Sequence, residues 1–352
     1  MVLAVEELNL YGLAENPDLV GLKQIVSEPV QEDYDHSFLG RVSRLLEPNF
    51  NSDFNRELQD PKTYISTDGS NIPMTYRVFN QEYLNNGNPI VVYNFSLFVP
   101  GHRGAELPSV FEITKVAREH NSAVVAITTD GYDQPLTNQQ LLSLHDFKSM
   151  ANRKLDLLES ISTNGQELII TGASLGGMMS YEMAALNSKR LNPKLKILEI
   201  ISICSSGHNA YSPSDLSCVF RQFTTGEIVP AAKYLVQDLD PLSILKRSLE
   251  MVQTLPTSAQ QVMASSIIAY SILHSPLVGV EKEIPPETIV IDELYADDKV
   301  SQPQYRNSNW KKAREHPKNK HRVLIENGNH LTLLTHGLMT TLHYLFLTKS
   351  QL

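Results

Sequence analysis

Cysteine is nearly absent from the sequence. Of the 352 residues only two are cysteine, Cys204 and Cys218, and neither stands in a C-x-x-C motif or beside a cluster of histidines. Two cysteines cannot build a disulfide framework, and no pattern of zinc ligands is present. The glycine-rich stretch from Gly172 to Gly177 has neither the G-x-G-x-x-G spacing of a dinucleotide site nor the Lys-Ser/Thr that follows a phosphate loop. We therefore expect a protein that works with no metal and no other cofactor.

Positive charge and long hydrophobic runs are also scarce. The formal net charge is -9, with 30 Lys and Arg against 39 Asp and Glu, whereas proteins whose main partner is nucleic acid need a basic surface. No apolar run approaches the ~18 residues of a membrane span, and the N-terminus lacks the basic region of a secretory signal. These absences predict a cytoplasmic protein with no membrane span and no nucleic-acid partner.

Strand and helix patterns alternate along most of the chain, which is long enough for one large domain with an accessory piece or for two ordinary domains. Short apolar runs rich in β-branched residues predict strands at residues 63–67, 72–79, 89–99, 122–127, 168–170, 196–203, 288–291 and 321–325. Helical spacing of apolar residues predicts helices at 106–120, 141–161 and 178–186, and a C-terminal helix that runs through Leu347. This order is typical of the α/β class, with a mostly parallel central sheet and helices on both faces.

Two segments depart from this alternation. Residues 1–60 predict a helical extension that covers the core, although a contact in a homo-oligomer or a wall of the substrate entrance is an alternative. Residues 207–284 contain no good strand, and so long a stretch is not a plain loop. We expect a helical cap or lid inserted over the carboxyl ends of the strands, where open α/β sheets bind ligands. The core would then consist of residues 61–206 and 285–352.

The motif G-x-S-x-G, formed by Gly172, Ser174 and Gly176, links the apolar run 168–170 to the helical stretch 178–186. A chain of this length matches three such positions by chance about once in ten cases. The strand before and the helix after make the match more specific. A sharp strand-to-helix turn lifts the serine hydroxyl above the sheet, and the start of the helix offers N–H groups to a developing negative charge. Ser174 is therefore the candidate nucleophile.

The order of these parts resembles the α/β-hydrolase superfamily over roughly residues 63–347. The resemblance depends on the Asp68-Gly69 hairpin, on Pro100-Gly101-His102 after the third strand, on the Gly172-Ala-Ser-Leu-Gly176 elbow, and on an acid and a histidine at late strand ends. It implies an α/β-hydrolase fold and a Ser-Asp-His triad in that chain order.

The base is expected to be His330. A serine hydroxyl is a weak nucleophile at neutral pH and needs an adjacent neutral histidine. Among the eleven histidines, His330 follows the last predicted strand and precedes the last helix, in Gly328-Asn-His330. This is the position where the resemblance places the catalytic histidine.

The resemblance implies that the acid that orients the histidine follows the strand before the last one. Asp297 and its neighbour Asp298 both stand there. Asp297 lies three residues before Val300, as in many members of the superfamily, and the peptidase branch uses the first aspartate of an Asp-Asp-x-Val run. We therefore assign the acid to Asp297, with Asp298 as a turn or capping residue and Glu293 as the fallback.

An acyl-transfer site also needs two donors where the oxyanion forms. The first expected donor is the backbone N–H of Leu175, just after the nucleophile, and the second is the backbone of His102. The predicted strand that ends at Val99 is longer than this position needs, so the second donor could instead lie near Ser96 or Leu97.

Together these residues predict a serine hydrolase that cleaves a carboxylic ester of a small-molecule acyl substrate through an acyl-enzyme on Ser174. A thioesterase, an amidase or a peptidase with the same triad remains an alternative. So does a non-catalytic binding protein on the same fold, since a fold does not determine a function.

Overall fold

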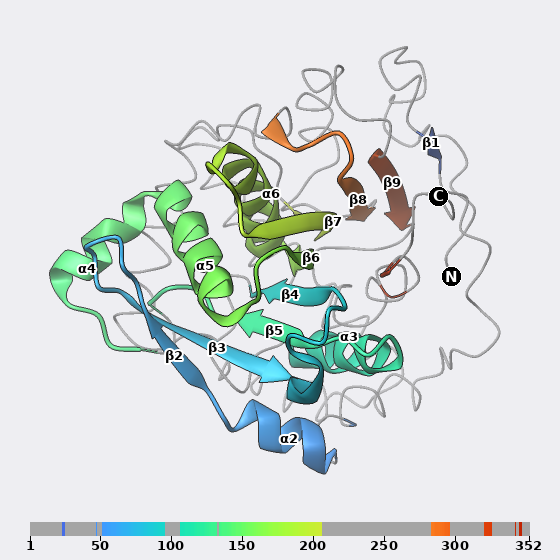
Figure 1. Cartoon of the computed structure of the whole chain (residues 1–352), viewed down its shortest axis with the longest axis horizontal. Helices are drawn as coiled ribbons and strands as arrows, with labels where there is room; N and C mark the ends of the chain where they lie inside the picture. The colour runs from blue at the N-terminus through green and yellow to red at the C-terminus, as the bar shows by residue number, and fades with distance from the viewer. Residues whose placement is uncertain are drawn as a thin grey trace, which may run out of the picture.

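A computed structural model gives the architecture of the chain (Figure 1). It describes residues 23–24, 47, 51–95, 106–131, 134–205, 283–295, 320–325, 342 and 345–346. Most of these residues belong to one sheet and to the helices that cover it. Among the helices so described, none combines the length and the hydropathy that a membrane span requires.

Nine strands of the described part form a single sheet. They are β1 (Lys23–Gln24), β2 (Lys62–Ile65), β3 (Pro73–Phe79), β4 (Ile90–Asn94), β5 (Val124–Ile127), β6 (Gln166–Ala173), β7 (Leu195–Ile203), β8 (Ile289–Tyr295) and β9 (Lys320–Ile325). Their order across the sheet is β1-β9-β8-β7-β6-β4-β5-β3-β2. β3 pairs antiparallel with β2 and β5, and all other neighbours are parallel. The predicted α/β class with a mostly parallel sheet is therefore confirmed.

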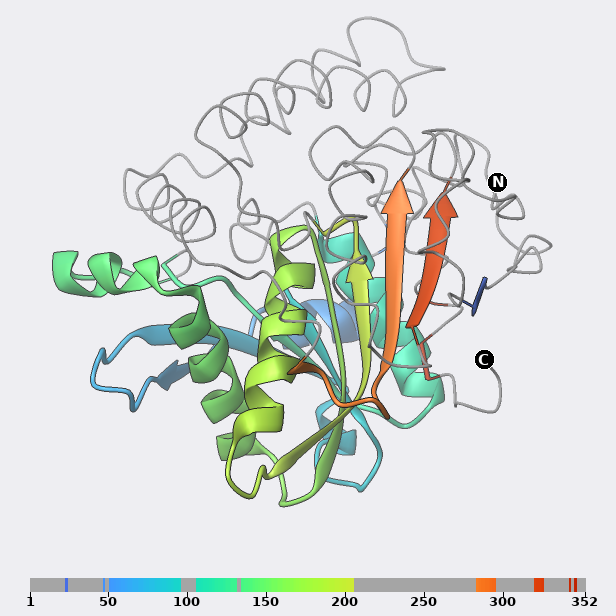
Figure 2. The ribbon, with the colours of Figure 1, turned by 90° about the horizontal axis from the view of Figure 1, so that it is seen from above.

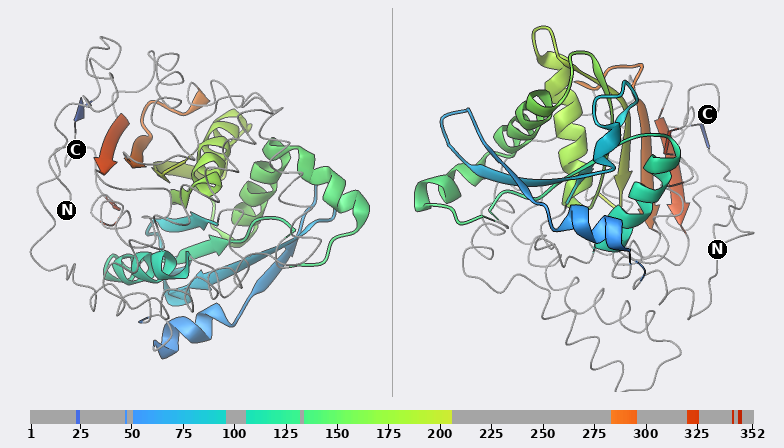
Figure 3. Two further views of the ribbon diagram at one scale, coloured as in Figure 1. Left: turned by 180° about the vertical axis from the view of Figure 1, so that it is seen from behind. Right: turned by 60° about the horizontal axis from the view of Figure 1, so that its bottom comes forward.

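Helices cover both faces of this sheet. Figure 2 shows the sheet between α6 (Leu175–Lys189) on one side and α3 (Leu107–Glu119) on the other. α5 (Phe147–Ile161) packs on the same face as α6, and α2 (Ser52–Leu58) packs on the same face as α3. The remaining short elements are α4 (Asn138–Leu142) and the 3-10 turns η3 (Gln81–Tyr83) and η5 (Ser143–His145). Figure 3 shows α4 beside the β2–β3 hairpin, where the Gln140 side chain donates to the Asn71 carbonyl at 2.7 Å.

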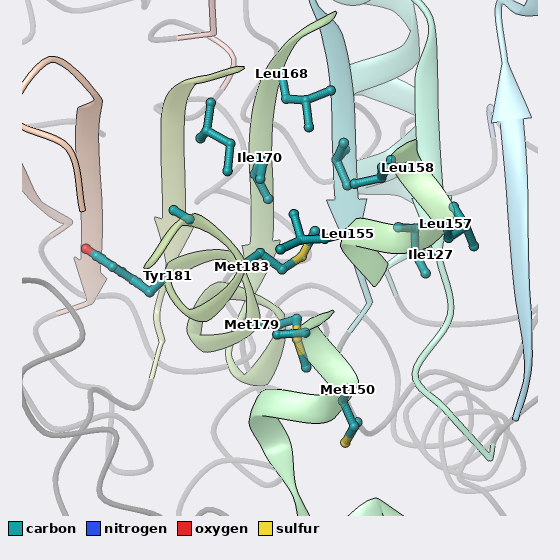
Figure 4. Close-up of a cluster of buried hydrophobic side chains, with 14 of the residues drawn as sticks. Ile127, Met150, Leu155, Leu157, Leu158, Leu168, Ile170, Met179, Tyr181 and Met183 are labelled. Carbon is teal, nitrogen blue, oxygen red and sulfur yellow. The ribbon is translucent and has the colours of Figure 1, made fainter. Parts of the chain in front are cut away.

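The sheet divides the hydrophobic core into two clusters. All five residues of β4 are buried, as expected for a parallel strand covered on both faces. Alternate residues point to opposite faces, so Val92 packs in the α5–α6 cluster and Val91 in the α2–α3 cluster. Figure 4 shows the first cluster, in which Ile170 of β6 packs near Leu155 of α5 and Met183 of α6.

The connections change direction between β4 and β6. These two strands are parallel neighbours, but the helix after β4 covers one face of the sheet and the helix after β6 covers the other. Such a switch point leaves a crevice outside the carboxyl ends of the two strands, where α/β proteins bind ligands. Asn94 and Ala173 end these strands, so Ser174 lies at the switch point.

Two of the predicted elements differ from the structure in ways that bear on the site. The strand predicted to reach Val99 ends at Asn94, and residues 96–105 lie outside the described part. The helix predicted from Leu141 to Ile161 is divided into α4, η5 and α5. The reason for the division is Asp146, whose side chain accepts from the backbone N–H of Lys148 at 3.0 Å and starts a new helix.

The extension and the insertion are described only in part. Within residues 1–60 the described elements are the helix α2 and the short strand β1, whose residues Lys23–Gln24 pair with β9. The insertion expected at 207–284 lies outside the described residues as far as residue 282.

Candidate active site

The turn between β6 and α6 holds Ser174 in a strained conformation. β6 ends at Ala173, α6 begins at Leu175, and Ser174 between them has φ 49° and ψ -115°. L-residues rarely adopt a positive φ, and holding one there costs on the order of 1–3 kcal/mol. The Ser174 N–H donates to the Ile203 carbonyl at 2.8 Å, and its own carbonyl accepts from the Met178 N–H at 3.3 Å. The predicted strand, sharp turn and helix are therefore observed, and the strain resembles that of a nucleophile elbow.

Close backbone contacts explain the glycines of the motif. A Cβ on Gly172 would lie 2.7 Å from the Asn94 carbonyl oxygen and 2.6 Å from the Gly176 carbonyl carbon. A Cβ on Gly176 would overlap the same Asn94 oxygen. A Cβ on Gly177 would lie 2.8 Å from both Ser202 Oγ and Ser205 Cβ. The start of α6 is therefore pressed against the ends of β4 and β7, with no room for a side chain.

The first turn of α6 supplies the positive end of a helix dipole beside Ser174. The N–H groups of its first turn have no carbonyl partners within the helix, and the side chain of Ser174, the N-cap residue, does not cap them. Leu175, whose N–H is the predicted first oxyanion donor, is the first residue of this helix. Such a helix start favours a negative charge near its first turn.

A buried series of hydrogen bonds connects α5 and β4 to the first turns of α6, next to the elbow. Lys154 of α5 donates from Nζ to Asn94 Oδ1 at 3.2 Å, and Asn94 Nδ2 donates to Ser180 Oγ at 3.2 Å and to Met183 Sδ at 3.5 Å. Ser180 Oγ donates to the Gly176 carbonyl at 2.9 Å. Lys154, Asn94 and Ser180 are each no more than 1% exposed. These bonds join α5, β4 and α6 next to Ser174.

Three charged groups act electrostatically on Lys154 within this core. Burial lowers the pKa of Lys154 to about 8, while Asp130 raises it, Arg153 lowers it and Glu106 raises it. Asp130 follows β5 and pairs with the buried Arg153 at 2.8 Å. Arg153 also pairs with Asp68 at 3.1 Å. Burial would raise the pKa of Asp68, but hydrogen bonds from Ser70 and Arg153 hold it at about 2.

A second buried pair fixes the two ends of the segment between β4 and α3. Tyr93 donates its hydroxyl to Glu106 Oε2 at 2.7 Å, so the strand before the segment is tied to the residue that follows it. Burial and the Glu106 carboxyl raise the pKa of Tyr93 well above its usual value. Thr129 Oγ1 donates to the Phe95 carbonyl at 2.9 Å and holds the exit from β4. The segment 96–105, where the second oxyanion donor is predicted, thus begins and ends at fixed points.

Sequence reasoning missed Asn94 and Lys154. The available signal was the spacing of Met150, Ala151, Lys154, Leu155 and Leu158, which all lie on the buried face of α5. A lysine at such a position must find a polar partner inside the protein.

The other predicted site residues lie outside the described part of the chain. These are His102, Asp297 and His330, together with the alternatives Ser96, Leu97 and Asp298. The strands that precede the acid and the base are described: β8 ends at Tyr295 and β9 at Ile325. Because both run parallel to β6, their carboxyl ends lie at the same edge of the sheet as Ser174.

Glu293, the fallback acid, is fully buried inside β8. Its backbone carbonyl accepts from the Cys204 N–H at 2.8 Å. A residue inside the strand is less suited to reach a histidine above the strand ends than one in the loop that follows. Within the described ranges, no group of three or more His, Cys, Asp and Glu is placed to hold a metal ion.

No protein-family model matches the chain, and no curated protein matches its sequence. Solved structures do match. The α/β-hydrolase enzyme MGS-M2 from a Medee basin deep-sea metagenome library is similar with a TM-score of 0.56 and 14% identity over 81% of this chain and 95% of that one. The enol-lactonase from Burkholderia xenovorans LB400 has a TM-score of 0.55 and 14% identity, over 81% of this chain and 99% of its own. A carboxylesterase from the thaumarchaeon Nitrososphaera gargenis has a TM-score of 0.52 and 15% identity, over 78% and 92% of the two chains. Together with the strand order and the elbow, these likenesses show that the chain has the α/β-hydrolase fold.

Proposed function

We propose that the protein is a serine hydrolase that cleaves a carboxylic ester through an acyl-enzyme on Ser174. The observation that carries the proposal is the strained backbone of Ser174, held between β6 and the start of α6 at the switch point of the sheet. Strain of this size persists only where the surroundings enforce it, and it occurs mainly at functional sites. That solved structures of the same fold include an enol-lactonase and a carboxylesterase supports the ester as the substrate class.

In the proposed reaction His330 removes the proton from Ser174 Oγ as that oxygen attacks the ester carbonyl carbon. Asp297 holds the imidazole and stabilises the imidazolium that forms. His330 then gives the proton to the leaving alcohol, and the carbonyl re-forms as the acyl-enzyme. A water molecule activated by His330 attacks the acyl-enzyme, which releases the carboxylic acid and restores Ser174.

The N–H of Leu175 is the proposed first oxyanion donor. For the second donor, the end of β4 favours Ser96 or Leu97 over His102. The Phe95 N–H is already used by the Ile127 carbonyl at 3.2 Å, so the next amide along the chain is that of Ser96. The carbonyl of Asn94 lies against Gly176, so the chain leaves β4 directly beside the elbow.

A fluorophosphonate probe, which reacts with activated serines, tests the nucleophile. We expect the probe to label the wild-type protein and not Ser174→Ala. Ser188→Ala is the matched control, because Ser188 lies at the other end of the same helix and bonds the Ala185 and Glu283 carbonyls. Labelling that persists in Ser174→Ala would move the nucleophile elsewhere, and an unlabelled wild type would favour a binding protein.

The adjacent aspartates provide their own control for the triad. We expect Asp297→Asn to reduce the hydrolysis of p-nitrophenyl esters by about 10⁴-fold, as loss of a triad aspartate does, and Asp298→Asn to retain most of the activity. His330→Ala should abolish it, whereas His102→Ala should have little effect.

A panel of esters, thioesters and aminoacyl amides then separates an esterase from a thioesterase, an amidase or a peptidase. The cytoplasmic location and a homo-oligomer stay predictions.

A further inference from the structure

We propose that Lys154 is a positioning residue for the elbow: its buried ammonium fixes the side-chain amide of Asn94, which in turn holds the first turns of α6 against the end of β4. The proposal rests on the proposed function in so far as the elbow carries the nucleophile.

The cost of burying Lys154 indicates that its place in the core is specific. Lys154 is 1% exposed and lies on the apolar face of α5. An apolar side chain at this position would pack without the desolvation penalty that an ammonium brings. Among the described residues, its hydrogen bond is made to Asn94 Oδ1. The ammonium is thus aimed at the residue that ends β4 and lies beside the elbow.

The chemistry of the ammonium decides the orientation of the amide. A protonated lysine only donates, so Asn94 must turn Oδ1 toward it and Nδ2 away from it. In this orientation Nδ2 donates to Ser180 Oγ, and the Ser180 hydroxyl is free to donate its proton to the Gly176 carbonyl. A neutral amine also accepts hydrogen bonds, so it would no longer specify which way the amide points.

These hydrogen bonds act where the backbone of the elbow has the least room to move. The backbone carbonyl of Asn94 lies against both Gly172 and Gly176. A small rotation of Asn94 would therefore shift the first turn of α6, and with it Ser174 and the Leu175 N–H. Misplacement of reacting groups by about 1 Å can cost on the order of 10²-fold in rate.

Hydrogen exchange tests the proposal without requiring activity. We expect Lys154→Met to raise the exchange rate of backbone amides in residues 172–183 by about 10-fold, because the supporting bonds are lost. Arg190→Met is the matched control. Arg190 also links α5 to α6, through Asp156 and Glu159 at 2.7 Å each, but at the far end of the helix. It should leave exchange in residues 172–183 unchanged.

Labelling kinetics test the same idea at the nucleophile. We expect the second-order rate constant for the fluorophosphonate probe to fall about 10-fold in Lys154→Met and to stay unchanged in Arg190→Met. In the wild type the rate should also fall as the pH rises through about 8, where Lys154 loses its proton, and this decrease should be absent from Lys154→Met. Within the described part of the chain, Asp130, Arg153 and Glu106 are the charged groups that shift the pKa of Lys154, and all three remain in both proteins.

The outcomes separate the two proposals. Equal exchange in residues 172–183 of wild type and Lys154→Met would overturn the role of Lys154, whether or not the protein is active. Labelling that does not depend on Ser174 would overturn the proposed function and leave the exchange result standing. Should Lys154→Met not fold, Ser180→Ala removes the next bond of the chain. It should raise exchange in the same residues by about 3-fold, and unchanged exchange there would also refute the proposal.

Discussion

The two ends of α6 are held in different ways. At the N-terminal end the backbone lies against Asn94, and a buried chain of hydrogen bonds runs from Gly176 to Lys154. At the C-terminal end Lys189 pairs with Glu283 at 2.6 Å, and its side chain is 53% exposed. Arg190, 18% exposed, pairs with carboxylates of α5.

The two ends of α6 therefore have different roles: the N-terminal end positions Ser174, and the C-terminal end contributes only to stability. Backbone contacts and buried hydrogen bonds allow one arrangement, because displaced groups would clash or lose their partners. The exposed ion pair of Lys189 with Glu283 tolerates movement, since water and salt screen the charges and both side chains are long. The end of α6 that carries Ser174 is the end that allows one arrangement, so changes there should affect both folding and chemistry.

The largest expected effect comes from Gly176→Ala. The new Cβ would overlap the Asn94 carbonyl oxygen, and neither backbone can move without disturbing β4 or α6. We expect a loss of unfolding free energy of about 4 kcal/mol, above the roughly 1–3 kcal/mol of ordinary overpacking, because the clash is with backbone and not with a flexible side chain. Urea denaturation measures it. Stability equal to that of Ser188→Ala would show that the N-terminal end is more tolerant than its contacts indicate.

Glu182, in the middle of α6, should make stability depend on pH. Burial, together with Glu283 and Asp146, raises the pKa of Glu182 to about 7, against the opposing charges of Lys148 and Lys189. The unfolded chain has the ordinary value of 4.5, so it loses the proton first as the pH rises. Stability therefore falls from about pH 4.5 and levels off above about pH 7, by on the order of 3 kcal/mol.

A comparison of the wild type with Glu182→Gln isolates the pH-dependent contribution of Glu182 to stability. The glutamine cannot ionise, so the difference in unfolding free energy between the two proteins should change between pH 5 and pH 8 in favour of the variant. Urea denaturation at the two pH values measures it. A difference that is the same at both would mean that Glu182 titrates normally in the folded protein.

A smaller effect is expected at Ser174 itself. Ser174→Gly and Ser174→Ala both remove the hydroxyl, but only glycine adopts φ 49° without steric strain. After the larger entropy loss of glycine is subtracted, we expect Ser174→Gly to be more stable than Ser174→Ala by about 1 kcal/mol. Thermal unfolding of the two variants measures the difference. If alanine is the more stable, the turn stores no strain.

The sequence predicted the part of the fold that depends on local pattern. Runs such as Leu168–Ile170 are apolar enough to be buried on both faces, so the strands and their alternation with helices along the chain follow from composition and periodicity. The elbow was predictable because positions that have no room for a Cβ must be glycine, and these glycines can be seen in the sequence. Gly172 and Gly176 stand where a Cβ cannot fit, and this leaves a trace in the sequence.

Features that depend on contacts distant in sequence were not predictable. The start of α5 at Asp146 was missed for a different, local reason: helical spacing continues through Asp146 and hides its capping bond to Lys148. Lys154 contacts Asn94, a residue 60 positions away, and no local pattern encodes that pairing. The pairing of Lys23–Gln24 with β9 is likewise a property of the assembled sheet.

The smallest effect is expected at the C-terminal end of α6. Lys189→Ala removes the ion pair with Glu283, whose side chain is 39% exposed. Because both groups stay hydrated and lose side-chain entropy when they pair, we expect a cost of about 0.5 kcal/mol or less, and less still in 1 M salt. Urea denaturation at low and high salt measures it, and the labelling rate of Ser174 should not change. A slower labelling rate in Lys189→Ala would contradict the proposed difference between the two ends of α6, because the C-terminal end would then also position the nucleophile.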